Sequence, residues 1–224
     1  MSQHPSDPYG TPQATPPALS LPRRDLREAV RGPVTPPATA LTSQPAQQSL
    51  ELAQRYELLN RLGMPTVGNE DFDELARDMA ERAGFLYGFV NLGLEKQTFV
   101  GLHQPPADSG YVIVGRTMSR DHGWCPEVMT RKKALPLHDV HASPRFSGNA
   151  VVDAVGIRSY FGAPLIHESG VVLGTVCVID PERRPLSEAR RIRDITIHGG
   201  AQAMDLIAHQ PVRQAVPPPP TREP

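Results

Sequence analysis

Two apolar runs in the C-terminal half of the 224-residue chain constrain its fold more than any other feature. Residues 158–166 and 171–179 are rich in β-branched and aromatic side chains, and residues 167–170 between them have the composition of a turn. The second run is apolar at almost every position, which is typical of a central strand covered on both faces. The two runs therefore predict two strands joined by a turn, the second of which lies in the middle of a sheet.

Upstream of these runs, the sequence changes from a helical period to an extended one. Apolar residues recur at three- and four-residue steps over 47–62 and again over 72–83, which predicts two amphipathic helices. Asp71 and Glu74 predict a capping box at the start of the second helix, and Gly84 predicts its end.

The helical and extended sequence periods also predict the remaining helices and strands. The other expected elements are strands at 85–92, 97–103 and 134–138, a loop at 104–117, a short helix at 126–131, an irregular loop at 139–149 and a last helix from 187 to 209. Ser187 is the expected cap of that last helix, and the pair Gly199-Gly200 inside it predicts a weak point, a kink or a close packing contact. This order describes an α+β domain, with a mostly antiparallel sheet, the terminal helices on one face and the irregular middle segment on the other.

The two ends of the chain differ from its middle in composition. Many of the 25 prolines fall in residues 1–45 and 211–224, where apolar residues are sparse and show no period. Such segments bury too little apolar surface to offset the entropy lost on ordering. We therefore expect disordered proline-rich tails at 1–45 and 211–224 around one folded domain at 46–210.

Charge and hydropathy argue against several classes of partner. The formal net charge is −1, and the basic cluster within residues 183–193 is interleaved with acidic residues, so no nucleic-acid partner is expected. No membrane association is expected either, because the sequence has no signal-peptide pattern and no apolar run long enough to span a bilayer. Two cysteines make no disulfide framework and suit a reducing compartment. These observations predict a cytoplasmic protein.

Several stretches of the sequence, in the same order along the chain, resemble one known family. The stretches are residues 69–75, 82–92, 137–140, 143–146, 156–165 and 172–180. The last two resemble the final core strands of GAF domains, and the others are similar to the entry helix, first strand and strand-to-loop segment of that family. The resemblance covers roughly residues 48–209 and is nearest to small free-standing GAF proteins of actinobacteria.

The resemblance implies a GAF/PAS-like sheet of about six antiparallel strands, with a small-molecule pocket under a helix and loop on the face opposite the terminal helices. It also implies a sensory domain that is not an enzyme and that signals through a homodimer or a partner protein. The cofactor is left unassigned. The candidate ligand-binding residues are Tyr87, Phe89, Trp124, Cys125, Met129, His141, Phe146, Arg158 and Tyr160.

The two cysteines leave three chemical interpretations open. Cys125 precedes an expected helix, whose N-terminus, together with Arg120, His122 and Arg131, favours a thiolate for redox sensing or covalent ligand attachment. Alternatively, Cys125 is a small buried residue that lines the pocket. Cys177 lies within the most apolar strand and is expected in the core. A thiol reductase similar to the methionine sulfoxide reductases would require the two sulfur atoms to come close enough to bond.

An Asp–Arg pair is expected to tie the loop 139–149 to the sheet. Asp139 and Asp180 each end an expected strand, whereas Arg145 and Arg158 flank the loop. A sharper alternative is a buried arginine that reads an acidic ligand.

Other specialised sites lack their sequence signatures. The chain has no cyclic-nucleotide or bilin pattern of the GAF family, no glycine-rich phosphate loop and no HExxH helix. His138 and His141 have no further ligands at suitable spacing, so no metal is expected. A ligand-free dimerising module, with segments such as 217–220 recruiting partners in an extended polyproline conformation, is a second interpretation of the whole chain.

Overall fold

The two apolar runs form adjacent strands of the sheet, and the second run is a central strand, as the sequence predicts. In the computed structural model, β5 (Ser159–Ile166) pairs antiparallel with β6 (Val172–Asp180), and every residue of β6 is buried. The turn between them ends at Gly170, whose φ of 83° lies in the left-handed region that favours glycine.

The structure describes residues 44–209. The tails expected at 1–45 and 211–224 lie outside the described residues, except that Gln44 and Pro45 form the start of a helix. None of the helices in the described part of the chain is long and apolar enough to cross a membrane.

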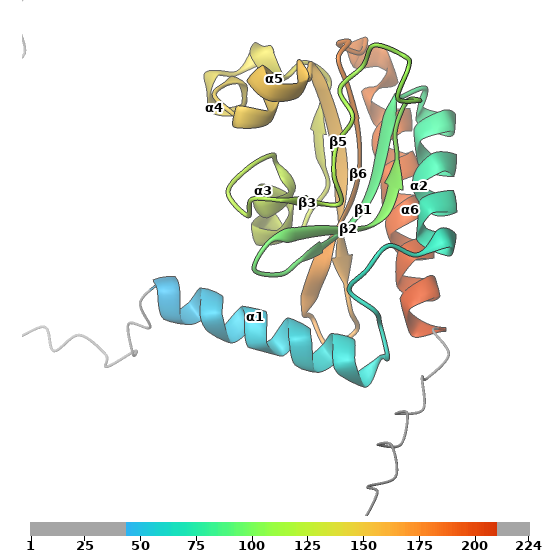
Figure 1. The fold of residues 1–224 in the computed structure, drawn as a ribbon. Coiled ribbons are helices and arrows are strands. Elements are labelled where there is room, and N and C mark those ends of the chain that lie inside the picture. The colour runs from blue at the N-terminus through green and yellow to red at the C-terminus, as the bar shows by residue number, and fades with distance from the viewer. Residues whose placement is uncertain (1–43, 210–224) are drawn as a thin grey trace, which may run out of the picture. The chain divides into compact units, whose positions relative to one another are not determined.

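The complete sheet has six antiparallel strands in the order β3-β2-β1-β6-β5-β4 (Figure 1). The remaining strands are β1 (Tyr87–Gly93), β2 (Gln97–His103), β3 (Thr117–Met118) and β4 (Leu135–Leu137). Strand β3 lies at the end of the segment expected to be a loop, and its two residues are too few to show any period.

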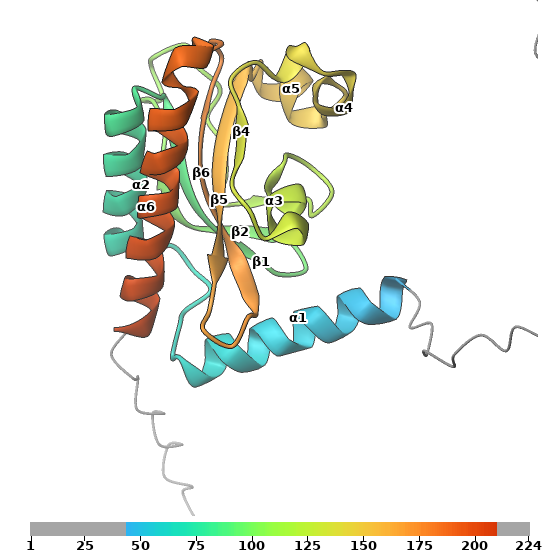
Figure 2. The same ribbon diagram turned by 180° about the vertical axis from the view of Figure 1, so that it is seen from behind.

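Two helices cover one face of the sheet (Figure 2). These are α2 (Glu70–Ala83) and α6 (Ala189–Ala208), which pack against the central strands and against each other. The first helix, α1 (Gln44–Arg61), instead runs across one end of the sheet, where the Arg55 guanidinium donates to the carbonyl groups of Gly93 and Val172. The expected placement of the terminal helices on one face therefore holds for α2 and α6 but not for the whole of α1.

Glycines allow the helices to lie close to their neighbours. A Cβ atom at Gly88 or Gly101 would overlap a backbone carbonyl group of α2, so these positions of β1 and β2 require glycine. In α6, a Cβ atom at Gly199 would overlap the sulfur of Met79. Of the three explanations offered for Gly199-Gly200, close helix packing is the one that the structure supports.

Both helix caps expected from the sequence are wrong. Helix α2 begins one residue before Asp71, and the Asn69 side chain accepts a hydrogen bond of 2.8 Å from the backbone N–H of Asp71. Asn69 has the extended backbone that an N-cap needs, whereas Asp71 is already inside the helix. Helix α6 follows the 3₁₀ turn η2 (Leu186–Glu188), which contains Ser187, and has no side-chain cap. The end of α2 at Gly84, with φ of 75°, is confirmed.

Short helical segments cover the other face of the sheet (Figure 1). They are α3 (Cys125–Arg131), η1 (Val140–Ala142), α4 (Pro144–Ser147) and α5 (Ala150–Val155). The loop expected at 139–149 therefore contains short helices. The sheet separates two hydrophobic clusters, one under α2 and α6 and one under α3 and α5.

Candidate functional site

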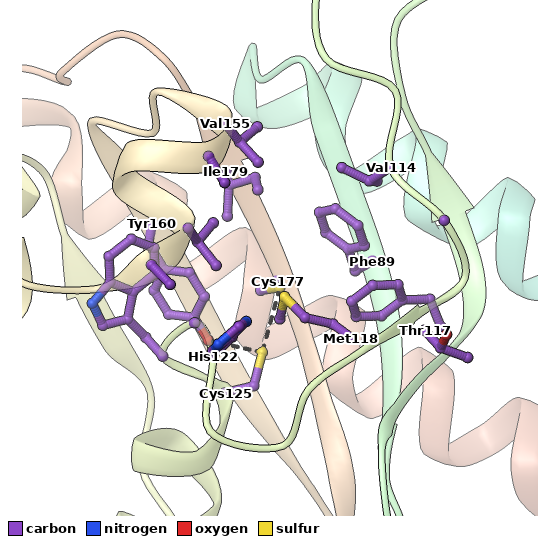
Figure 3. A pocket seen from close by; sticks show the side chains of 17 residues that line it. Phe89, Val114, Thr117, Met118, His122, Cys125, Val155, Tyr160, Cys177 and Ile179 are labelled. Carbon is purple, nitrogen blue, oxygen red and sulfur yellow. Dashed lines mark hydrogen bonds between the residues drawn. The ribbon is translucent and has the colours of Figure 1, made fainter.

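A cavity of about 320 Å³ lies between the sheet and the segment that carries α3 and α5 (Figure 3). Its wall is formed mainly by apolar and aromatic side chains from the strands, the segment 114–124 and the two short helices. These include Phe89, Phe99, Val114, Thr117, Met118, His122, Trp124, Cys125, Val151, Ala154, Val155, Tyr160, Cys177 and Ile179. The volume lies at the small end of the range for ligand pockets, about 300–1,000 Å³.

Side chains alternate between the two faces of each strand, and this alternation decides which residues line the cavity. In β6, Cys177 and Ile179 face the cavity, whereas Val176 and Val178 belong to the cluster under α2 and α6. The adjacent residues Tyr160 and Phe161 of β5 point to opposite faces for the same reason: Tyr160 lines the cavity, and Phe161 packs edge-to-face on Phe85 on the helix side.

The two thiols of the chain meet at the wall of this cavity. The Sγ atoms of Cys125 and Cys177 are 3.9 Å apart, and the Tyr160 hydroxyl lies 3.5 Å from Cys125 Sγ (Figure 3). The exposed fractions of the two cysteines are 4% and 3%. Gly162 lies opposite Cys177 in the β5–β6 ladder, and a Cβ atom there would overlap the Tyr160 hydroxyl. Glycine at this position therefore makes room for the hydroxyl beside the sulfur atoms.

Buried polar side chains connect the sheet with the loop that precedes Cys125. Asn91 Nδ2 donates to Thr175 Oγ1 at 3.4 Å and to Gln97 Oε1 at 3.2 Å. Gln97 Nε2 in turn donates to the carbonyl groups of Ser119 and His122 at 2.8 and 2.6 Å. These side chains were not predicted from the sequence, although polar residues within apolar strands are a signal of buried hydrogen bonds.

Neighbouring hydrogen bonds separate the acidities of the two thiols. A hydrogen bond from Cys177 lowers the pKa of Cys125 to about 7, against the opposing effect of burial, and Thr175 and Tyr160 add to the lowering. The same hydrogen bond, together with burial, raises the pKa of Cys177. Cys125 is thus the stronger acid of the pair. The causes are buried hydrogen-bond partners rather than the cationic side chains expected from the sequence.

The model of the GAF domain family matches residues 68–192, which is more than half of the chain. The chain belongs to the GAF domain family. A cyclic di-GMP phosphodiesterase of Pseudomonas aeruginosa is 39% identical over 75 residues, which cover 33% of this chain and 13% of that protein. The chain therefore spans only a small part of the length of that relative.

Solved structures with a similar arrangement include other GAF domains. The GAF domain of an Acinetobacter phosphoenolpyruvate-protein phosphotransferase is 18% identical, with a TM-score of 0.47 and coverage of 73% of this chain and 94% of that chain. A free methionine-R-sulfoxide reductase from Neisseria meningitidis is 12% identical, also with a TM-score of 0.47, and the coverage is 73% and 93%.

Four of the nine predicted ligand-binding residues of this GAF domain line the cavity, namely Phe89, Trp124, Cys125 and Tyr160. Tyr87 lies just behind the wall, where its ring stacks on Phe89 with the centroids 6.5 Å apart.

The structure does not bring the other four predicted residues into the cavity wall. Met129 is four residues after Cys125 on α3, about 6 Å further along the helix axis, and its side chain packs over Gly93. His141 is exposed on η1. Phe146 supports the wall from behind, since its carbonyl group accepts a hydrogen bond from Trp124 Nε1 at 3.3 Å. Arg158 forms an ion pair with Asp139.

The Arg158–Asp139 ion pair, at 3.3 Å, ties the loop to the sheet as expected. The backbone reinforces it, because the N–H of Val140 donates to the carbonyl group of Arg158. Asp180 has another partner, Arg184, at 2.9 Å. The alternative use of Arg158, reading an acidic ligand in the cavity, has no support in this arrangement.

A second, polar cavity of about 660 Å³ lies between α1 and α3. Its charged side chains are of both signs: Glu51, Arg55, Arg120, Asp121 and Lys132. Within residues 44–209, no group of three or more His, Cys, Asp and Glu residues is placed to hold a metal ion.

Proposed function

We propose that this GAF domain is a non-enzymatic sensory module that binds a small, neutral and largely apolar molecule in the 320 Å³ cavity. The observation that carries the proposal is the cavity wall, in which aromatic and aliphatic side chains surround a few polar groups. Such a combination is typical of small-molecule sites, where apolar surface provides affinity and a few polar groups fix orientation.

The charge distribution supports a neutral ligand. His122 is the one wall residue with a basic side chain, and it is exposed. Burying a charged group without a partner is costly, so a phosphate or carboxylate would bind poorly among these side chains. The Tyr160 hydroxyl and the two thiols are the polar groups available to orient a ligand deep in the cavity.

Hydrogen bonds connect the cavity wall with surface segments, so a bound ligand could change the position of those segments. Gln97 holds the loop before Cys125 through two carbonyl groups, and Asn149 exchanges hydrogen bonds of 2.9 and 2.8 Å with the backbone of Gly123. A ligand that moves this loop would therefore also move α5. We propose that a homodimer or a partner protein reads this change, which requires the ligand to bind two states with different affinity.

Fluorescence of Trp124 tests the binding proposal directly, because Trp124 is the single tryptophan of the chain and lines the cavity. The neutral probe N-phenyl-1-naphthylamine, titrated into the full chain, should quench the fluorescence of Trp124, and the fluorescence of the probe itself should increase. Ala154→Phe adds a bulky side chain to the cavity wall and should weaken probe binding. The matched variant Ala208→Phe, which is likewise exposed but lies on α6 and outside the cavity wall, should not. Equal binding by the two variants would refute the proposed site.

Redox sensing is a second candidate function. It is favoured by one observation, the 3.9 Å separation of the two buried sulfur atoms.

A further inference from the structure

The paired thiols give the cavity a chemistry that ligand binding does not use. We propose that Cys125 and Cys177 form a reversible intramolecular disulfide when a hydroperoxide enters the cavity, and that this bond lowers the affinity of the cavity for its ligand. The first half of this inference stands on the thiol pair alone, and the second half rests on the proposed ligand-binding function.

The positions of the two sulfur atoms allow the bond with little movement. They are 3.9 Å apart, and a disulfide bond is about 2.05 Å long, so roughly 1.9 Å must be closed. Cys177 is fixed in β6, which pairs with β1 on one side and with β5 on the other. Cys125 is the first residue of the short helix α3, directly after a loop. The movement therefore falls mainly on Cys125.

The chemistry balances with one equivalent of hydroperoxide. The Cys125 thiolate attacks the terminal peroxide oxygen, so that an S–O bond forms, the O–O bond breaks and the leaving alkoxide takes up a proton as the alcohol. The Cys177 thiol then gives up its proton as its sulfur attacks the sulfenic sulfur, so that the S–S bond forms, the S–O bond breaks and the leaving hydroxide takes up that proton as water. A dithiol reductant reverses the reaction by thiol–disulfide exchange and is itself oxidised to a disulfide.

The roles of the two cysteines follow from their surroundings. The lowered pKa of Cys125 leaves a substantial fraction of thiolate at neutral pH, and the thiolate is the reactive form. Cys177, with a raised pKa, stays protonated and acts second. Both residues line the cavity, so an oxidant small enough to enter it reaches the sulfur atoms although little of their surface meets bulk solvent.

Closing the bond would move the cavity wall. Cys125 follows Trp124 directly, and the Trp124 ring packs against Tyr160 with the centroids 5.2 Å apart. The preceding loop is tied to Gln97 and, through Gly123, to the segment of α5. A shift of Cys125 towards β6 therefore pulls part of the wall inward. The oxidised cavity should be smaller and should bind a probe less tightly.

The test uses the full chain, reduced and then freed of reductant. Hydrogen peroxide should lower the intact mass by two hydrogen atoms, and peptide mapping without reduction should find a Cys125–Cys177 peptide pair. Cys177→Ala also removes the hydrogen bond that lowers the pKa of Cys125, so this variant should react more slowly and stop at a sulfenic acid on Cys125 that dimedone traps. Cys125→Ala should leave Cys177 unmodified. Two free thiols after treatment, or disulfides only between chains, would overturn the proposed bond.

The same samples test the coupling to ligand binding. Oxidation should weaken binding of N-phenyl-1-naphthylamine by about fivefold or more, and dithiothreitol should restore both the mass and the affinity. Unchanged affinity of an oxidised protein that carries the mapped disulfide would overturn the coupling. If the reduced protein binds no probe while the disulfide forms, the ligand-binding function fails and the redox pair is supported.

Discussion

Replacing Tyr160 or Phe161, which are adjacent on β5, should have different consequences because their side chains point to opposite faces of the sheet. Phe161 is 0% exposed and packs edge-to-face on Phe85 with the centroids 5.8 Å apart. Truncating such a side chain costs the transfer free energy and leaves a cavity, so Phe161→Ala should lower the free energy of unfolding by about 3–5 kcal/mol. That is a large fraction of the total stability of a domain, typically about 5–15 kcal/mol.

Tyr160→Phe keeps the ring and removes only the hydroxyl 3.5 Å from Cys125 Sγ. The expected loss is that of one hydrogen bond, about 0.5–1.5 kcal/mol. The hydroxyl helps to lower the pKa of Cys125, so its removal should raise that pKa. The variant should therefore keep its fold and lose thiolate at neutral pH.

Two assays separate these effects. Urea unfolding followed by circular dichroism measures stability, and Phe161→Leu serves as a milder helix-side variant if Phe161→Ala does not fold. The rate of alkylation of Cys125 by iodoacetamide measures thiolate. For the unmodified chain the rate should rise as the pH passes through about 7, since the thiolate forms above that pKa. In Tyr160→Phe this rise should shift to higher pH, and in Phe161→Leu it should not. Equal destabilisation by Tyr160→Phe and Phe161→Ala would contradict the different roles of the two side chains. An unshifted alkylation profile in Tyr160→Phe would contradict the effect of the hydroxyl on the pKa of Cys125.

Three other predictions concern packing, the loop and the disulfide. Gly88→Ala should strongly lower the melting temperature because the added Cβ atom overlaps the backbone of α2. At Gly148 an added Cβ atom would have nothing within 4 Å, so Gly148→Ala should leave the melting temperature nearly unchanged. Similar melting temperatures of the two variants would contradict close packing at Gly88. Gln97→Ala leaves two carbonyl groups without their donor, so it should lower the free energy of unfolding by about 1–3 kcal/mol. It should also accelerate amide hydrogen exchange in the loop before Cys125. Unchanged exchange would exclude the role of Gln97 in holding that loop. A disulfide bond between Cys125 and Cys177, which are 52 residues apart, should raise the free energy of unfolding by about 4 kcal/mol. Denaturant titration of the reduced and the oxidised protein measures this difference. An oxidised protein of lower stability would contradict the prediction and indicate a strained bond.

Strands could be predicted from the sequence where they are long enough to show a pattern of apolar residues. The strands β5 and β6 are eight and nine residues long and apolar at most positions, and the turn between them ends in a glycine. Strand β3 has two residues, and η1 and α4 have three and four, so none of them shows a period. The cap of α2 was misplaced because Asn69 and Asp71 are both good caps by composition, and the extended backbone at Asn69 decides between them.

The candidate site was predictable only in part, because a cavity joins segments whose relative positions the sequence does not give. Phe89, Trp124, Cys125 and Tyr160 were among the residues predicted from the sequence, and all four line the cavity. The meeting of Cys125 with Cys177 depends on where α3 lies over the sheet, which no local pattern encodes. The role of Gly162 depends on the register of β5 against β6.

A native mass spectrum of the full chain, purified from its own host, shows whether the cavity holds a ligand. We expect a discrete added mass that is lost under denaturing conditions, absent from Ala154→Phe and retained by Ala208→Phe. An added mass that Ala154→Phe retains would place the ligand elsewhere. No added mass on any of the three proteins, with no binding of N-phenyl-1-naphthylamine by the reduced chain, would contradict a ligand-binding role for the cavity.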